Sequence, residues 1–553
     1  MLLKKLSNII CNHLFLFIAV FGIVFASLTL PFGYWGFVGD DYGNILHSQL
    51  QSWSDFIKLF YEGDACSFYQ ASNYVPSEPN FFSVYYRPMA FVFTYIQSIF
   101  FGFNPYGYFL IFILFHAINA ALIFNIFSWF IPLGWAFLMA LFFAFHISLG
   151  SWFGWLPAFQ QIINLTLLLL ILILLKQYLK TREIFYYVGA VFLFLVSLFN
   201  RETFLVFPFL LTLGVIIFRD KAETLCHSVF RAIKISACFW LAFSVYFYTR
   251  LYFFPIKFVH SGLCFHDGVI SVSNRFLEAV SFLSDLFGLS FMPAGHRLCK
   301  GVLIISIFTL IFTLFLKNEQ IKRLSFLAFS LLAFMWPAFL THYLPRSLYE
   351  SALFLFCLIL IFLFKYSTID CFGFQIVKKF IFGLGVFMCA FFMIKSMKTS
   401  EQLILKINTA FAELCLNKSI INKPLCFVEL PCSFIATGVA QAVWMRGVNK
   451  GLPIFELQLP IKVFKEEWNK IIPMHKRFVN IEVVNTGLRA VACLPNVLCF
   501  DVTPGAQNIL INKTVRGNVV DVFLPLSDKW PMDRLVFIGW DYDAFKFKIL
   551  NGV

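Results

Sequence analysis

The stretch YGYFLIFILFHAINAALIFNIFSWF, from Tyr106 to Phe130, contains no charged residue. An α-helix rises about 1.5 Å per residue, so a run of this length can cross a hydrocarbon core of about 30 Å. Comparable apolar runs recur through the first four hundred residues of the 553-residue chain. They predict a mostly α-helical polytopic membrane protein.

The composition agrees with that fold class, since 60% of the residues are hydrophobic and 13% are charged. The formal net charge of +14 does not indicate a nucleic-acid partner. The Lys and Arg residues cluster in short segments between the apolar runs, as the positive-inside rule expects of cytoplasmic loops. The clusters are Lys4 with Lys5, Lys176 to Arg182, Arg219 to Lys234, Lys317 to Arg323, and Lys365 to Lys379.

Placing all five basic clusters in the cytoplasm predicts about 11 spans, a cytoplasmic N-terminus and an outer C-terminus. One apolar run, Met89 to Phe103, is too short to span with ease, and we expect an interfacial helix in the first outer loop there. The predicted spans are Leu14–Leu30, which we expect to stay uncleaved, Tyr106–Phe130, Leu133–Gly150, Ile162–Leu175, Ile184–Phe199, Thr203–Phe218, Ile233–Phe254, Val302–Leu316, Leu324–Thr341, Tyr349–Phe364 and Phe380–Ile394.

The chain divides into a membrane region, residues 1–399, and an extracytoplasmic domain, residues 400–553. The second part has no apolar run long enough to span, and it combines a helical pattern with β-rich segments. The helical pattern runs from Glu401 to Leu416, and the β-rich segments include CFVEL, RFVNIEVVN, NVVDVFLPL and RLVFIGWDYDAFKFKIL. We therefore expect a soluble α+β domain at the C-terminus.

Charged residues gather at the outer ends of the predicted spans. A charge at membrane depth costs about 2 to 3 kcal/mol unless it is paired or in contact with water. Asp40 and Asp41 follow the first span, and Arg201, Glu202 and Arg346 also lie near span ends. Taken singly they fit interfacial charges with water access, whereas their gathering on one side favours a shared cavity.

Five motifs then occur in an order that resembles a known family. They are GDDYGN after the first span, YYRPM (Tyr85–Met89), FFGFNPYGYFLIFILFHAINAAL (Phe100–Leu122), LFFAFHISLGSWFGW (Leu141–Trp155) and LFNRETFLVFPFLL (Leu198–Leu211). Together they resemble the C-type (GT-C) membrane glycosyltransferases. The likeness is to the branch of protein O-mannosyltransferases and the tetratricopeptide-bearing O-mannosyltransferases. It covers about the first 220 residues and, more weakly, HYLPRSLYESALF from His342.

The resemblance implies a GT-C-like bundle and a polyprenyl-phosphate-linked sugar, mannose or another hexose, as donor. The acceptor would be a protein or glycan on the outer face of the membrane. By carry-over, Asp40 is the candidate general base, and Asp41 is a positioning or metal-coordinating partner. A carboxylate within hydrogen-bond reach can take the proton of an acceptor hydroxyl.

The resemblance also assigns the basic residues and one histidine. Arg346 is the candidate for the donor phosphate, because a guanidinium binds oxyanions in a bidentate manner. Arg87 would hold the loop or the acceptor side, and Arg201 with Glu202 matches a basic and acidic pair of the family. His116 matches a family histidine, for which a satisfied hydrogen bond between helices is an equal alternative to substrate contact.

Two departures from the family pattern bear on cofactors and domains. Ile147 follows His146 where the family has proline, and Gly150 or Ser151 holds the place of a second acid. The identity of any cofactor, including a divalent metal, therefore stays open. The C-terminal region shows no 34-residue helical repeat, so the repeat domain of the animal branch is absent from the sequence.

Three other functions are consistent with parts of the sequence. A transporter or flippase for lipid-linked glycans would also need a polar cavity among apolar helices. A polymerase or ligase of surface polysaccharide would use similar outer arginines. A relative that has lost activity would lack the second acid.

Overall fold

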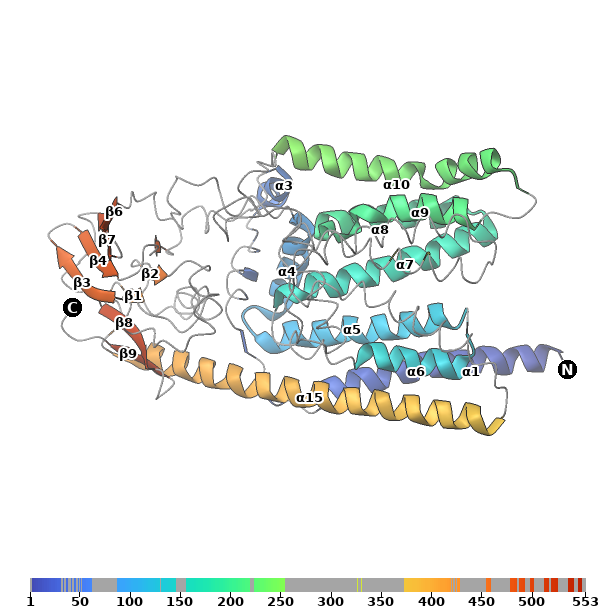
Figure 1. Cartoon of the computed structure of the whole chain (residues 1–553), viewed down its shortest axis with the longest axis horizontal. Helices are drawn as coiled ribbons and strands as arrows, with labels where there is room; N and C mark the ends of the chain where they lie inside the picture. The colour runs from blue at the N-terminus through green and yellow to red at the C-terminus, as the bar shows by residue number, and fades with distance from the viewer. Residues whose placement is uncertain are drawn as a thin grey trace.

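The computed structural model describes residues 2–30, 53–61, 87–129, 131–145, 156–218, 223–253 and 372–418, together with single positions between 33 and 52, four further single positions (326, 330, 420 and 423), and nine strands between 425 and 549. Figure 1 shows long helices lying side by side along the longest axis of the molecule. The N-terminus lies at one end of this bundle, and the strands lie beyond the other end. We call these the N-terminal end and the strand end.

The helices correspond to eight of the predicted spans. Their bounds are α1 (Leu2–Thr29), α5 (Pro105–Phe127), α6 (Leu133–Ala144), α7 (Phe159–Thr181), α8 (Ile184–Asn200), α9 (Phe207–Ile217), α10 (Leu225–Phe253) and α15 (Phe372–Leu416). The three other predicted spans, 302–316, 324–341 and 349–364, lie outside the described residues apart from positions 326 and 330. The number of 11 spans therefore stays a prediction.

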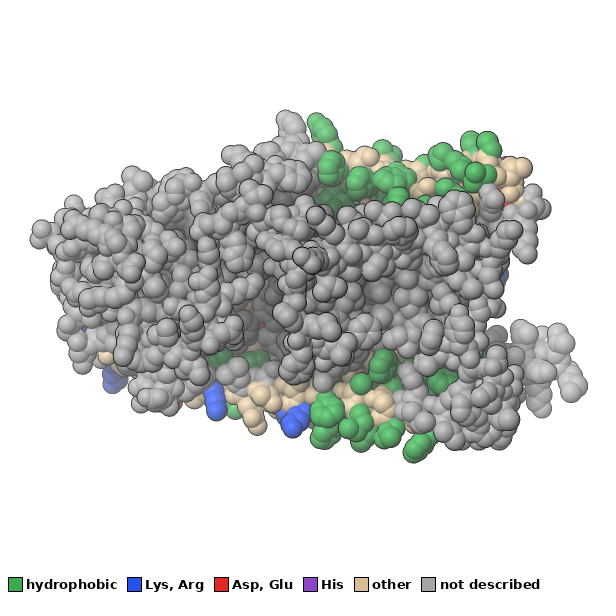
Figure 2. All heavy atoms as spheres, in the orientation of Figure 1, with side chains coloured by type: hydrophobic (Ala, Val, Ile, Leu, Met, Phe, Trp, Pro, Cys, Tyr) green, Lys and Arg blue, Asp and Glu red, His purple; other side chains and the backbone are tan. Residues whose placement is uncertain are grey.

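Four stretches of the described helices are long and apolar enough to cross a membrane: Asn12–Thr29, Pro105–Phe127, Phe159–Thr181 and Leu225–Thr249. Figure 2 shows hydrophobic side chains on the outward surface of α10 and of the first half of α15. Such a surface needs an apolar surrounding. Among these exposed side chains are Leu241, Phe380, Phe387 and Phe391. Exposed apolar surface of this extent is typical of a protein that faces lipid. The fold therefore indicates a membrane protein.

The middle of the bundle is filled by aromatic side chains from α5 and its neighbours. Tyr108, Phe109, Phe112 and Phe124 of α5 are almost fully buried, as is Phe143 of α6. Helix α5 contacts α1, α6 and α7, which surround it. A helix covered on all sides has no polar face to present, so the all-round apolar sequence of α5 follows from its central position.

The predicted interfacial helix is α4 (Pro88–Phe101), which begins with a proline at its first position. Its 14 residues span about 21 Å, which is less than the hydrocarbon core. In Figure 1 α4 crosses the strand end of the bundle at a steep angle to the long helices, and it contacts α5 and α8. This placement agrees with a helix that does not span.

Helix α6 is shorter than the predicted span Leu133–Gly150, because it ends at Ala144. The carbonyl of Ala144 has no amide one turn further along its own helix. Instead it accepts a hydrogen bond from His116 Nε2 of α5 over 3.0 Å. The last carbonyls of a helix require such outside partners, and His116 supplies one.

Helix α15 joins two elements that the sequence predicts as separate, the span Phe380–Ile394 and the helix from Glu401 to Leu416. It is continuous over 45 residues, or about 68 Å. The segment KSMKTS between the two predicted elements contains neither glycine nor proline, so nothing in it ends the helix. The predicted boundary at residue 399 therefore falls inside one helix.

The strands form two sheets. The first has the order β5-β2-β1-β8-β9, with β1 parallel to β2 and β8, and the second is the antiparallel sheet β3-β4-β7-β6. Their bounds are β1 (Leu425–Phe427), β2 (Ile454–Gln458), β3 (Phe478–Val484), β4 (Gly487–Ala492), β5 (Leu498–Asp501), β6 (Asn512–Arg516), β7 (Val519–Pro525), β8 (Val536–Asp541) and β9 (Lys546–Ile549). Strands β3, β7, β8 and β9 fall within the predicted β-rich segments, and β1 overlaps one of them.

Basic residues lie at the N-terminal end of the bundle. Helices α7 and α8 form a tight hairpin there, closed by Arg182 in the left-handed conformation (φ 62°), whose N–H donates to the Tyr178 carbonyl over 2.8 Å. Lys176 lies over the ring of Trp129 at 3.3 Å from its centroid. The basic clusters of two loops and the start of α1 therefore share one end.

Cysteines introduced at Phe103 and Thr181 test whether the bundle spans a membrane. Both positions are exposed, and they lie at opposite ends of the helices. We expect Phe103→Cys to react with a membrane-impermeant thiol reagent from one side of sealed vesicles and Thr181→Cys only from the other. The unsubstituted protein gives the background from native cysteines, and labelling of both positions from the same side would contradict the arrangement.

Candidate functional site

Asp41 connects the loop that follows α1 to the start of α7. Its side chain is fully buried, and its Oδ1 accepts a hydrogen bond from the backbone N–H of Leu156 over 2.6 Å. Leu156 opens a short 3-10 turn, Leu156–Ala158, that leads directly into α7. The first N–H groups of a helix lack partners within the helix and favour negative charge. The carboxylate of Asp41 supplies both a hydrogen-bond acceptor for the Leu156 N–H and a negative charge beside the helix start.

Arg87 reaches the same helix from α4. It is the residue immediately before α4, it is partly buried, and its Nη1 donates to Gln160 Oε1 over 3.3 Å. Gln160 lies in the first turn of α7, four residues after Leu156. Two charged residues predicted from separate motifs therefore contact neighbouring positions at the start of one helix.

The third connection comes from the end of α8. Asn200 Nδ2 donates to the carbonyl of Gln160 over 2.8 Å and to Asn164 Oδ1 over 2.6 Å. Asn164 Nδ2 in turn donates to Thr203 Oγ1 over 3.2 Å and to the carbonyl of Arg201 over 3.4 Å. This network fixes the backbone of Arg201, which is extended between α8 and the 3-10 turn Glu202–Val206.

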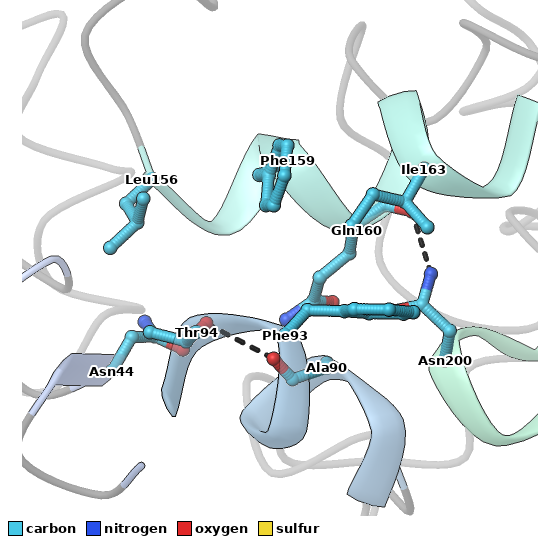
Figure 3. Close-up of a pocket in the computed structure, with 9 residues that line it drawn as sticks. All are labelled: Asn44, Ala90, Phe93, Thr94, Leu156, Phe159, Gln160, Ile163 and Asn200. Carbon is cyan, nitrogen blue, oxygen red and sulfur yellow. Dashed lines mark hydrogen bonds between the residues drawn. The ribbon is translucent and has the colours of Figure 1, made fainter. Parts of the chain in front are cut away.

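A small pocket lies among these contacts, between α4, the start of α7 and the end of α8 (Figure 3). Amide and hydroxyl groups come from Asn44, Thr94, Gln160 and Asn200, and the other walls are apolar. The apolar lining residues are Ala90, Phe93, Leu156, Phe159 and Ile163. Within the described part of the chain, the buried Oδ1 of Asn200 accepts no hydrogen bond. The space open to a water-sized group is about 10 Å³, which is enough for about one water molecule.

The other predicted residues are placed as follows. His116 is buried in α5, and its contact with the Ala144 carbonyl is the interhelical hydrogen bond that the sequence left as an alternative to substrate contact. Glu202 begins the 3-10 turn after α8, and its side chain is not described. Asp40 and Arg346 lie outside the described residues, so their predicted roles stay predictions.

Metal ligands were a further possibility at this site. Among the described residues, no three His, Cys, Asp or Glu side chains gather closely enough to hold a metal ion. Asp41 is committed to the Leu156 amide, which favours its positioning role over metal coordination. Asp40 lies outside the described residues, so the binding of a divalent metal by that residue stays open.

Sequence reasoning from charges missed the amide side chains of the site. Gln160, Asn164 and Asn200 carry no charge and therefore did not enter the threading. Their signal is the polar segment QQIINLT, Gln160–Thr166, at the head of an otherwise apolar helix. Burying an amide without a partner costs several kcal/mol, so amides within apolar helices mark a network of hydrogen bonds.

The arrangement brings groups that favour negative charge to the strand end of the bundle. Arg87 is attached to the first turn of α7, and the network of Asn164 fixes the backbone at Arg201. Guanidinium groups and helix N-termini both favour phosphate oxygens. The acidic pair lies on the loop attached to the same helix start.

Comparisons with known proteins add no family assignment. No protein-family model matches the chain, and no curated protein matches it either.

Replacing Asn200 tests the amide network. We expect Asn200→Leu to lower the free energy of unfolding by about 1–3 kcal/mol for each group it leaves unpaired, because the Gln160 carbonyl and Asn164 Oδ1 both lose their donor. The measurement is the Tm of purified protein in detergent. The control is Thr249→Ala on α10, where the lost hydrogen bond is exposed and lies within one helix. Equal Tm values for both variants would contradict the network.

Proposed function

We propose that this protein is an inverting membrane glycosyltransferase. It transfers a sugar from a polyprenyl-phosphate carrier to an acceptor at the strand end of the bundle. The observation that carries the proposal is the meeting of three motifs at the start of α7. Asp41 binds the Leu156 amide, Arg87 binds the Gln160 side chain, and Asn164 binds the carbonyl of Arg201. The motifs that form the predicted GT-C signature thus come from distant parts of the chain to one place.

The proposed reaction is a single displacement at the anomeric carbon. The acceptor hydroxyl oxygen forms the new bond to that carbon while the bond to the carrier phosphate oxygen breaks. The hydroxyl proton passes to the carboxylate of Asp40, and the lipid phosphate leaves with the bonding electron pair. Arg201 and Arg346 stabilise the charge of the leaving phosphate, Arg87 holds the acceptor side, and Glu202 partners Arg201.

The proposed topology has about 11 spans, a cytoplasmic N-terminus and an extracytoplasmic strand end. The basic residues at the N-terminal end of the bundle support this orientation, because Lys and Arg accumulate in cytoplasmic loops. The strands of residues 425–549 support an outer α+β domain after α15. A lipid carrier in the outer leaflet then presents its sugar at the level of the α7 start.

Substitution of the acidic pair tests the proposed chemistry. With polyprenyl-phosphate sugars as donors, we expect Asp40→Asn to lower kcat about 10²- to 10⁴-fold, the usual contribution of a general base. The control is Asp55→Asn on α3 (Trp53–Tyr61), an acid of the same outer loop that has no assigned role. The assay follows transfer and donor hydrolysis by purified protein in lipid.

Two results would overturn the assignments separately. Equal rates for Asp40→Asn and the unsubstituted protein would rule out Asp40 as the base. Neither transfer nor hydrolysis by the unsubstituted protein with any carrier would instead favour a transporter of lipid-linked glycans.

A further inference from the structure

The outer half of α15 contacts the first outer loop through two side chains, although more than 360 residues separate them in the sequence. Glu401 Oε1 accepts a hydrogen bond from the backbone N–H of Gly33 over 2.8 Å. Asn408 Nδ2 donates to the carbonyl of Phe37 over 3.2 Å. The two residues are about two helical turns apart on α15, so together they hold the loop segment from Gly33 to Phe37 against one face of the helix.

Both side chains are themselves fixed. The second oxygen of Glu401 pairs with Lys398 Nζ over 2.7 Å. Asn408 is buried, and its Nδ2 also donates to the Ile404 carbonyl over 3.0 Å within α15. Neither contact therefore depends on a side chain that is free to rotate in solvent.

Gly36 shows how closely the loop lies on α15. A Cβ atom at this position would be 2.5 Å from Asn408 Nδ2 and 3.0 Å from Ile404 Cγ2. Because Asn408 Nδ2 donates two hydrogen bonds, it cannot move aside without breaking them. The contact therefore requires a residue without a side chain at position 36.

The loop is held on both sides of Asp40. Phe37 is bonded to α15 through Asn408, and Asp41 is bonded to the start of α7 through Leu156. Phe37 and Asp41 are four residues apart in the sequence, so the two attachments lie close together along the loop. One attachment belongs to the site at α7, and the other belongs to a helix that no predicted site residue occupies.

We propose that Asn408 and Glu401 are positioning residues that hold the loop carrying the acidic pair, Asp40 and Asp41, between α15 and the start of α7. The inference deepens the proposed function and rests on it for the reaction that Asp40 performs. Displacement of a reacting group by about 1 Å can lower a rate by 10²-fold, so a loop held at only one end would slow transfer. Donor binding by the arginines does not use this contact and is unaffected.

The contact itself is tested first, without any assay of activity. Asn408 Cγ, whose place the sulfur of a cysteine would take, lies 3.1 Å from the Cβ position of residue 36. We expect Gly36→Cys with Asn408→Cys to form a disulfide in the full-length protein in membranes, detected as a linked peptide pair by mass spectrometry. The matched control is Gly36→Cys with Thr409→Cys, the next residue of α15, whose side chain is exposed. Equal cross-linking of both pairs, or none of the first, overturns the inference.

The positioning role is tested by a double-mutant cycle on transfer. We expect Asn408→Ala and Gly36→Ala each to lower kcat about 10- to 100-fold while KM for the donor changes less than twofold. Asn408→Ala removes both atoms of Asn408 that a Cβ at residue 36 would meet. Ile404 Cγ2, 3.0 Å from the same Cβ position, remains. Gly36→Ala should therefore cause a smaller loss in the Asn408→Ala background than it causes alone, whereas independent defects would multiply. Thr409→Ala is the control.

The outcomes separate this inference from the proposed function. An Asn408→Ala variant that transfers at the unsubstituted rate overturns the positioning role. A loss of kcat that parallels a fall in Tm, with multiplying effects in the double variant, also overturns it. If the unsubstituted protein transfers no sugar from any carrier, the proposed function fails, while the disulfide still supports the contact of α15 with the loop.

Discussion

The hydrogen bond between the Asp41 carboxylate and the Leu156 amide is the contact on which the site depends. A fully buried carboxylate at the end of an apolar bundle is costly unless a donor meets it, and the first amide of a helix is such a donor. This requirement brings the loop that follows α1 to the start of α7. The pocket and the contacts of Arg87 are arranged around the same helix start.

The same requirement accounts for the amide side chains in α5, α7 and α8. Thr166 Oγ1 donates to Asn119 Oδ1, and Asn119 Nδ2 donates to the Ile162 carbonyl, so polar side chains join α5 to α7 within the bundle. Asn164 and Asn200 continue the pattern toward the strand end. A hydrogen bond between two helices is directional, so it fixes their relative position along the bundle axis more strictly than apolar packing does. The network therefore sets where Gln160 and Arg201 lie.

Much of the fold could be predicted from the sequence because a span requires a long apolar run, and a run is a local property. Helix α4 was predicted from the placement of the basic clusters together with its short apolar run, and the β-rich segments from their composition. The convergence of Asp41, Arg87 and Arg201 at one helix start was expected only as a gathering on one side. The contact of Asn408 with Phe37 could not be predicted, since neither segment contains a sequence pattern that indicates a partner 371 residues away. The neutral amides were missed because the placement of spans used charges only. Helix α15 was predicted as two elements because its sequence changes from apolar to polar, although no helix-breaking residue separates the two parts.

The commitment of Asp41 to a helix start also separates the roles of two adjacent acids. An oxygen that holds the Leu156 amide anchors the loop, and moving it would release both the loop and the helix start. A proton acceptor must instead meet a substrate that comes and goes, so within the proposed reaction this task falls to Asp40. Phe37, three residues before it in the sequence, is attached to α15, and Asp41, the next residue, is attached to the start of α7. Because α15 continues from the apolar bundle to its contact with β9, the helix that holds Phe37 is also the helix that joins the bundle to the strands.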